Sequence, residues 1–407
     1  MHNITIKNII LIISTSLIFL NLTIYLPFVG FFPFPAYFID LMIFISIVIF
    51  YLKKGLTFPY QNIIVVWILY YTTINISYFI ASPTGIEEFK FLKLFFFFLF
   101  MFFSFIFLFN LDDENMTTTR KTTVVLAPIL FILLAIDYFE PGYFYFGKEI
   151  VNYVAGRASA VFLNANIAGG ASVLLLILGI DMIPKKLRFI FIIILFLGVF
   201  FTMSRSNIMI FILTLIIMFF QKKLYASHLL IILTFVILFF TWLTTGGFDT
   251  LSDKYNLEVS QNMKSRVNFF ANNKSSDTGD MNERREVLST AIGMYTSNPI
   301  FGTGYASTRL WDYNVSPHNT LAMHWADYGI FGILLIPLMF FFSSVNIFKY
   351  GNRNQRHLAF LIITYFLLSC FFSHNMLEQP LQIAPIIMLS VIGHKVRNKY
   401  IQRDLSD

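Results

Sequence analysis

Long apolar stretches separated by short basic loops constrain this sequence more than any other feature. About twelve stretches are long enough, or nearly so, to cross a hydrocarbon layer of about 30 Å as a helix. They lie at about 9–29, 36–52, 60–81, 91–110, 122–138, 161–180, 187–203, 206–221, 227–243, 320–348, 357–373 and 379–394. We therefore expect an all-α polytopic membrane protein with about 12 transmembrane helices.

Composition excludes the main soluble classes. The 407 residues are 57% hydrophobic and 13% charged, about half the charged fraction that is usual in soluble proteins. The single cysteine, Cys370, lies in an apolar stretch, so no disulfide can form within the chain and no Cys-x-x-Cys metal motif exists. The formal charge of +7 comes from basic residues at the ends of apolar stretches, where they meet membrane lipids. We expect no nucleic-acid partner.

Basic residues mark alternate loops, which predicts the orientation in the membrane. With Lys7, six basic clusters contain 17 of the 29 Lys and Arg residues, and all fall on one side if the spans alternate. These clusters are Lys53–Lys54, Arg120–Lys121, Lys185–Arg188, Lys222–Lys223, Lys349–Arg356 and Lys395–Arg403. Because positive loops stay in the cytoplasm, both termini are expected there.

The stretch 187–221 is expected to form a helical hairpin. A single helix of this length would be about 50 Å long, more than a bilayer core, and would put its two flanking lysine pairs on opposite sides. A turn at Ser204-Arg205-Ser206 avoids both problems. Arg205 then lies near the outer boundary of the membrane, where a charge is costly without a function or a partner.

This topology predicts three regions. Residues 1–243 contain transmembrane helices 1–9, and residues 319–407 contain helices 10–12 and a cytoplasmic tail. Between them, residues 244–318 form one large outer loop with a short helix near 281–297.

Polar residues that suit phosphate and proton chemistry gather on the expected outer side. Arg157, Arg205 and Arg284 offer planar cationic forks that match phosphate oxygens, although an arginine at a helix end can also serve only to snorkel or to form a salt bridge. His318 precedes a span and could accept a proton, because imidazole titrates near neutral pH. His324 is expected to be structural, and His374 belongs to a second polar group beyond the eleventh span.

The order and spacing of several motifs resemble the O-antigen ligase/polymerase superfamily. The matching segments are Gly156-Arg157, Phe162–Asn166, Ser204-Arg205-Ser206, Arg284–Leu288, Asn298–Gly304, Pro317–Leu321 and Gly329–Gly332. The resemblance implies a GT-C-like membrane fold. It also implies an inverting, metal-independent glycosyl transfer from undecaprenyl diphosphate at the periplasmic face of the bacterial inner membrane.

The resemblance also assigns roles to residues. His318 would deprotonate the acceptor hydroxyl, and Arg205 and Arg284 would bind the leaving diphosphate with help from Arg157. Supporting positions are Asn319, Gly302, Gly304, Gly329 and His374. The implied partners are an undecaprenyl-diphosphate-linked oligosaccharide, a lipid-linked acceptor glycan and a chain-length regulator, and no cofactor or metal is expected.

Two branches of this superfamily and one other class remain open. A Wzy-type O-antigen polymerase, which joins repeat units, is favoured because the chain is rich in Phe, Ile and Asn. That bias is typical of an AT-rich surface-polysaccharide locus. An O-antigen ligase, which transfers the polymer to the lipid A-core, is the alternative. A polysaccharide or solute transporter is the second alternative; against it, the chain shows no inverted repeat.

Overall fold

The computed structural model describes residues 6–31, 36–52, 62–81, 99–104, 106–108, 110, 113–146, 157–242, 245, 278–309, 317–373, 376–377 and 379–404. Throughout these ranges the regular secondary structure is helical and no strand occurs, which confirms the all-α class. The chain forms two compact units, each of two sequence segments. Unit 1 contains Met1–Pro33 and Glu114–Gly279, and unit 2 contains Phe34–Asp113 and Asp280–Asp407.

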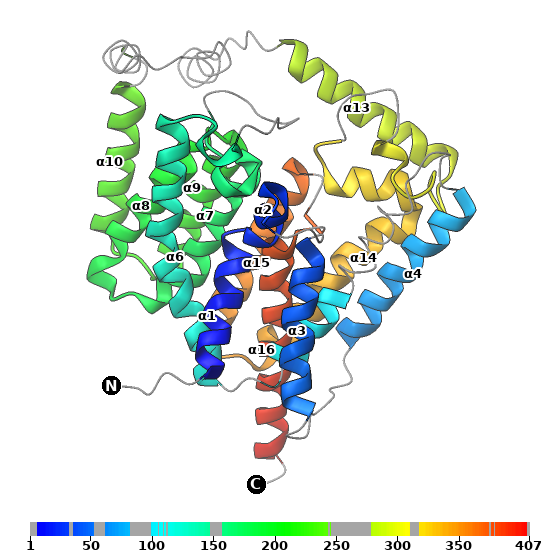
Figure 1. The fold of residues 1–407 in the computed structure, drawn as a ribbon, viewed down its shortest axis with the longest axis horizontal. Coiled ribbons are helices and arrows are strands. Elements are labelled where there is room, and N and C mark those ends of the chain that lie inside the picture. The colour runs from blue at the N-terminus through cyan, green and yellow to red at the C-terminus, as the bar shows by residue number, and fades with distance from the viewer. Residues whose placement is uncertain are drawn as a thin grey trace. The chain divides into compact units, whose positions relative to one another are not determined.

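Unit 1 is built around a buried central helix. Its helices are α1 (Ile6–Phe19), α2 (Leu22–Val29), α6 (Asp113–Phe139), α7 (Ala165–Gly179), α8 (Arg188–Phe201), α9 (Arg205–Phe220) and α10 (Ala226–Trp242) (Figure 1). All residues of α7 from Ala168 to its end are buried, and α7 packs against both α8 and α9. Small residues such as Gly169 and Ala171 in its first turns allow this close packing of helices.

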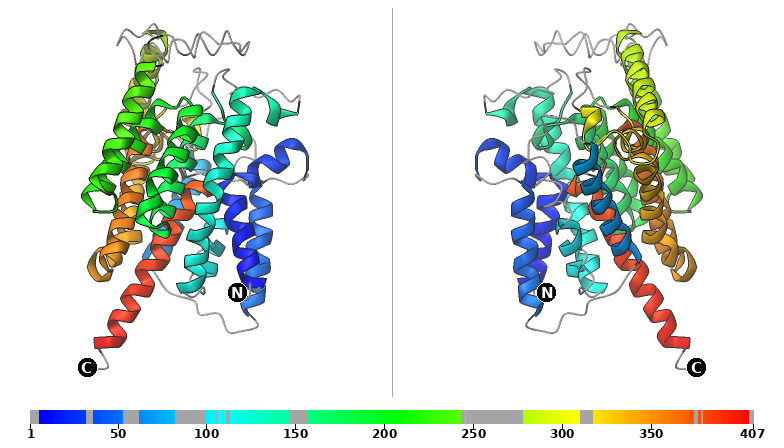
Figure 2. Two further views of the ribbon diagram at one scale, coloured as in Figure 1. Left: turned by 90° about the vertical axis from the view of Figure 1, so that its left-hand side faces the viewer. Right: turned by 90° about the vertical axis from the view of Figure 1, so that its right-hand side faces the viewer.

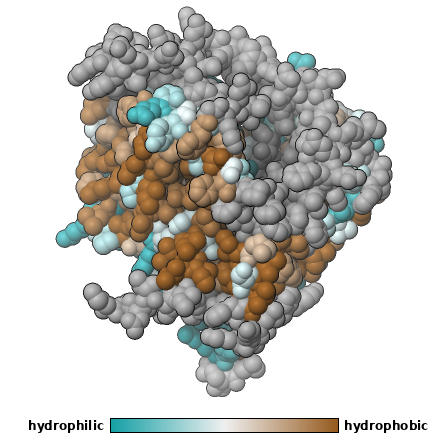
Figure 3. All heavy atoms as spheres, viewed as in Figure 1, coloured by the Kyte–Doolittle hydropathy of each residue, from teal (hydrophilic) through white to brown (hydrophobic). Residues whose placement is uncertain are grey.

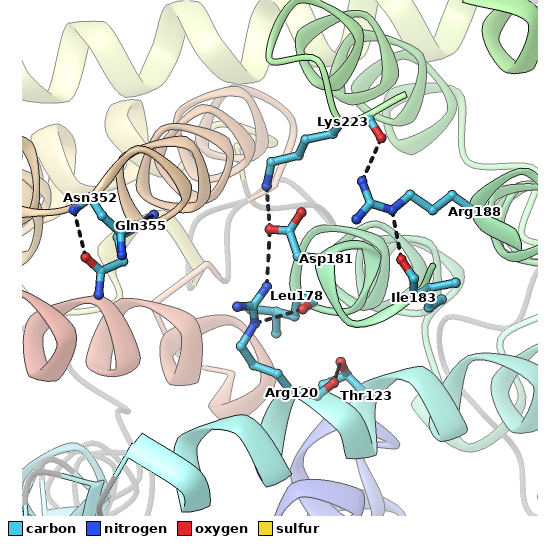
Figure 4. Close-up of polar contacts among 9 residues, drawn as sticks. All are labelled: Arg120, Thr123, Leu178, Asp181, Ile183, Arg188, Lys223, Asn352 and Gln355. Atoms are coloured by element: carbon cyan, nitrogen blue, oxygen red, sulfur yellow. Dashed lines mark hydrogen bonds and ion pairs between the residues drawn. The ribbon is translucent and has the colours of Figure 1, made fainter. Parts of the chain in front are cut away.

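Unit 2 is built around the longest helix of the described chain. It contains α3 (Ala36–Leu52), α4 (Asn62–Ala81), α13 (Thr278–Ser297), α14 (Thr320–Tyr350), α15 (Arg353–Phe372) and α16 (Pro380–Asp404). Helix α14 packs against α4, α15 and α16, and Figure 2 shows α16 in red extending to the C-terminus. A capping box begins α15, in which Asn352 and Gln355 exchange hydrogen bonds of 2.9 and 3.0 Å (Figure 4).

Several described helices can cross a membrane. By length and apolar composition these are 116–139, 165–182, 320–350 and 353–372, or five spans if the bent pair α1–α2 also counts as one. Apolar side chains such as Val125 and Met209 face outward from unit 1, and Figure 3 shows a broad hydrophobic surface over its helices. The structure therefore supports a helical membrane protein, whereas the full set of about twelve spans stays a prediction.

The expected first span is not one straight helix. It consists of α1 and α2, which meet at an angle of 72°. Asn21 takes a left-handed backbone conformation at the bend (φ 54°), and its side chain lies 3.5 Å from the carbonyl oxygen of Phe162. An asparagine tolerates this conformation better than most residues, which explains why the helix breaks here.

Two other predicted elements correspond to helices among the described residues. The stretch 187–221 is a hairpin, in which α8 and α9 are joined by Thr202-Met203-Ser204 and Arg205 is the first residue of α9. The short helix expected near 281–297 is α13, which begins at Thr278 and ends at Ser297. Most of the expected outer loop, including residues 246–277 and 310–316, lies outside the described residues.

Candidate functional site

Arg157 is held against the α8–α9 turn of unit 1 by two hydrogen bonds. Its Nε donates to the carbonyl oxygen of Thr202 at 3.1 Å, and its terminal Nη2 donates to Oδ1 of Asn166 at 2.7 Å. Both acceptors are neutral, so these two contacts orient the guanidinium without cancelling its charge. An oriented cation of this kind suits recognition of a phosphate oxygen.

A network of amide and hydroxyl groups supports this arginine. Asn166 Oδ1 also accepts from Ser204 Oγ at 2.9 Å, and Asn207 Nδ2 donates to the Asn166 carbonyl at 2.7 Å and to Ser204 Oγ at 2.9 Å. Asn207 can reach this position because Gly169 has no side chain. A Cβ at Gly169 would lie 2.7 Å from Asn207 Nδ2. The half-buried Arg205 follows Ser204 directly, so the network also fixes the start of its helix.

A buried carboxylate fixes the segment that carries Arg157. Asp137, near the end of α6, accepts hydrogen bonds at Oδ2 from the backbone N–H groups of Ser159 and Ala160, both at 2.7 Å. The N–H of Ala158 donates to the carbonyl oxygen of Phe201 at 2.9 Å. Residues 158–160 are therefore hydrogen bonded to both α6 and α8, so the backbone that follows Arg157 is fixed in position.

Sequence reasoning did not single out Asp137, Asn166 or Asn207 as site residues. Asp137 lies inside an apolar stretch, and its partners Ser159 and Ala160 are remote in sequence. Asn207 follows the polar Ser204-Arg205-Ser206 turn directly, but its partner Asn166 lies 41 residues away. In the sequence, Asn166 stands out only as the last residue of the motif Phe162–Asn166. The one local signal is Asn164, which caps α7 by accepting from the N–H of Asn166 at 2.8 Å and so marks an ordered helix start.

In unit 2, the glycine-rich segment pairs with a break in α14. Gly329 has non-helical backbone angles (φ 63°, ψ −149°), so the usual hydrogen bonds across that position are lost. The carbonyl oxygens of Ala326 and Asp327 instead accept from the N–H groups of Thr303 (2.9 Å) and Gly304 (3.1 Å), and Ile330 N–H donates to Pro299 at 2.9 Å. We call this pairing of residues 299–304 with 326–330 the backbone latch.

The glycines of the latch are required by close contact. A Cβ at Gly302 would lie 2.4 Å from the carbonyl of Asp327, and one at Gly329 would lie 2.4 Å from the carbonyl oxygen of Ile300. The buried Asp327 side chain adds to the latch, because its Oδ1 accepts from Ser307 Oγ at 2.9 Å and from Thr308 N–H at 3.0 Å. These contacts explain why Gly302 and Gly329 are glycines, whereas their supporting role in the site stays a prediction.

His318 lies just before the first turn of α14. It is half-buried, and the next residue, Asn319, caps the helix by accepting from the N–H of Ala322 at 3.0 Å. The hydroxyl of Thr320 donates to the carbonyl oxygen of Ser373 at the end of α15. His318 therefore stands on a helix start that is fixed both by its cap and by a neighbouring helix.

The other histidine of this helix has a packing role. His324 is 2% exposed; its Nδ1 lies 2.9 Å from the carbonyl oxygen of Thr320, and its Nε2 lies 2.7 Å from the hydroxyl of Tyr70 on α4. Since Nδ1 must donate to a carbonyl, Nε2 accepts from the tyrosine. The expectation that His324 is structural is confirmed.

Two predicted site residues are described less fully. Arg284 lies within α13, but its side chain is not described. On the same helix, Val287 and Ala291 are buried, and the centre of the Tyr295 ring lies 4.1 Å from that of Trp325. His374 lies outside the described residues. Within the described ranges, no group of three or more His, Cys, Asp or Glu residues could hold a metal ion.

The central part of this chain resembles a known protein family. Residues 190–336 match the family described as O-antigen ligase. The match covers 147 of the 407 residues, about a third of the chain. This match supports the resemblance to the O-antigen ligase/polymerase superfamily, whose members are membrane enzymes of the glycosyltransferase type acting on lipid-linked oligosaccharides. No curated protein matches the chain significantly.

The matched segment covers most of the predicted site. Arg205, Arg284, the glycines of the latch, His318 and Asn319 all fall within residues 190–336, whereas Arg157 and His374 lie outside them. The family match and the apolar helices together support the expectation of a bacterial membrane protein of lipopolysaccharide biosynthesis.

Proposed function

We propose that this protein is a Wzy-type O-antigen polymerase that joins undecaprenyl-diphosphate-linked repeat units at the periplasmic face of the inner membrane. The observation that carries the proposal is the orientation of Arg157 by Thr202 and Asn166, directly beside the turn that leads into Arg205. One arginine that is hydrogen bonded to a helix turn and another that directly follows this turn suit a diphosphate near a membrane surface.

The proposed reaction is a displacement at the anomeric carbon of the donor sugar. The acceptor hydroxyl oxygen attacks this carbon from the face opposite the diphosphate, and its proton passes to His318. The bond between the anomeric carbon and the phosphate oxygen breaks, and its electron pair stays on the diphosphate. Arg205 and Arg284, assisted by Arg157, stabilise that developing negative charge, so the proposed reaction needs no metal ion.

A ligase is the second candidate, because the matched family is described as O-antigen ligase. A ligase would perform the same displacement with the lipid A-core as acceptor. The fixed start of α14 around His318 supports a general base equally well in both enzymes, since each must deprotonate a sugar hydroxyl.

Deletion of the gene in its host, followed by gel display of lipopolysaccharide, tests the proposal. We expect core that carries a single repeat unit, restored to full ladders by the wild-type gene but not by His318→Ala or Arg205→Ala. His357→Ala, which changes a histidine near the start of α15, is the matched control and should restore the ladder. Immunoblots of membranes verify equal amounts of each variant.

The other outcomes are informative. Bare core with accumulated lipid-linked polymer would identify a ligase and overturn the polymerase proposal. An unchanged ladder in the deletion strain would refute glycosyl transfer to O-antigen altogether. Full rescue by His318→Ala would refute the assignment of the base.

A further inference from the structure

Four charged side chains converge at the end of unit 1 opposite the Arg157 network. Asp181, just after α7, accepts at Oδ2 from Lys223 Nζ at 2.6 Å and from Arg120 Nη2 at 3.4 Å (Figure 4). Arg188, at the start of α8, donates from Nη1 to the carbonyl oxygen of Lys223 at 2.7 Å. We call Arg120, Asp181, Arg188 and Lys223 the basic cluster.

The basic cluster holds more positive than negative charge. Three cations and one carboxylate leave two excess positive charges, and the other acceptors of these side chains, the carbonyls of Leu178, Ile183 and Lys223, are neutral. Lys223 is 4% exposed and Arg188 is 8% exposed, so water screens this charge poorly. Burial lowers the pKa of Lys223, although Asp181 opposes the shift. Among the described residues, Asp181 is the carboxylate that pairs with these cations. Buried charge in excess of its counter-charge is costly, which favours binding of an anion.

The surface next to the basic cluster combines cations with apolar side chains. Exposed lysines adjoin it in sequence on α6 and on two connecting segments, and exposed large hydrophobic side chains lie beside them. The lysines are Lys121, Lys185, Lys186 and Lys222, and the apolar side chains are Leu187, Ile190 and Phe220. Phosphate oxygens would bind the cations, and hydrocarbon chains would lie along the apolar surface.

We propose that the basic cluster binds the headgroup of an anionic phospholipid. Among the cations of the basic cluster, Arg120 has the most exposed side chain, at 19%. A phosphodiester can therefore reach its guanidinium. A lipid with two phosphodiesters, such as cardiolipin, matches the two excess charges, whereas phosphatidylglycerol supplies one. The lipid would neutralise the cluster and join the ends of α6, α7, α8 and α9. This proposal does not depend on the glycosyl-transfer chemistry.

Lipid binding to the purified full-length protein tests the proposal. The protein is placed in phosphatidylcholine nanodiscs, and cardiolipin bound at increasing fractions is measured by native mass spectrometry. We expect saturable binding by the wild type. Arg120→Gln should weaken it about fivefold, the effect of removing one basic contact near a membrane. Arg353→Gln, at an exposed arginine that begins α15, is the matched control and should bind like the wild type.

A second variant keeps the test valid if Arg120→Gln folds poorly. Lys185→Gln/Lys186→Gln leaves every contact of the basic cluster in place and should also weaken cardiolipin binding at least fivefold. An equal loss with Arg353→Gln would refute a specific site and show only general attraction of basic loops. Displacement of cardiolipin by millimolar inorganic phosphate would overturn the lipid assignment and indicate a site for free phosphate.

Discussion

Replacing Gly329 by alanine should destabilise unit 2 strongly. Its backbone angles (φ 63°, ψ −149°) lie in a region that is essentially restricted to glycine, where another residue costs about 1–3 kcal/mol. The new Cβ would lie 2.4 Å from the carbonyl oxygen of Ile300, so the latch must open. Its three backbone hydrogen bonds contribute about 0.5–1.5 kcal/mol each. With part of the latch retained, we expect a total loss of about 3–5 kcal/mol.

The single cysteine offers a direct assay for this change. Cys370 lies in α15 of the same unit and is 0% exposed, so a thiol-reactive dye labels it only when unit 2 opens. Each kcal/mol of lost stability lowers the unfolding midpoint by about 2–4 °C. A loss of about 3–5 kcal/mol should therefore lower the midpoint of heat-induced labelling by at least about 6 °C.

Gly293→Ala is the matched control for this assay. Gly293 lies in α13, and a Cβ there would meet nothing within 4 Å, so alanine should stabilise the helix by about 0.5–1 kcal/mol. A Gly329→Ala midpoint equal to that of the wild type would refute the latch. An equal fall in Gly293→Ala would show that the assay does not report on backbone strain.

Three further changes test the support of each unit. Gly169→Ala should displace Asn207, because the Cβ would lie 2.7 Å from its amide nitrogen, and complementation of the deletion strain should fail at normal protein levels. Asn164→Ala removes the cap of α7 and should cost about 1 kcal/mol in thermal unfolding followed by tryptophan fluorescence. Tyr70→Phe removes the hydroxyl that donates to Nε2 of the buried His324 and should lower the stability of unit 2 by about 1–3 kcal/mol, measured as a lower midpoint temperature of cysteine labelling.

The hairpin was predictable because its evidence is local. The lysine pairs at 185–186 and 222–223 required the chain to return to the same side, and the apolar stretch was too long for one span. The structure brings these loops into contact, since Arg188 donates to the carbonyl oxygen of Lys223. These two basic loops and Arg120 of α6 thus lie at one end of unit 1, and which side of the membrane that end faces stays a prediction.

The support around Arg157 could not be predicted, because it depends on contacts that no periodicity records. Asp137 sits in an apolar stretch, and its partners Ser159 and Ala160 are 22 and 23 residues away. A buried carboxylate of this kind is recognised only when the N–H groups that it accepts from are known. The same holds for the bend at Asn21, where an apolar stretch of sufficient length hides a helix break.

The backbone latch connects the glycine-rich segment 299–304 to α14 on either side of His318 in the sequence. Thr303 and Gly304 pair with Ala326 and Asp327, so the latch closes the segment between them, and His318 lies within that segment. Closing it reduces the freedom of the chain around the histidine without any contact to a substrate. Gly302→Ala, which would place a Cβ 2.4 Å from the Asp327 carbonyl, should therefore reduce transfer through the position of His318. Purified enzyme should lose kcat while binding of the lipid-linked donor is kept, whereas a loss of donor binding alone would refute this role.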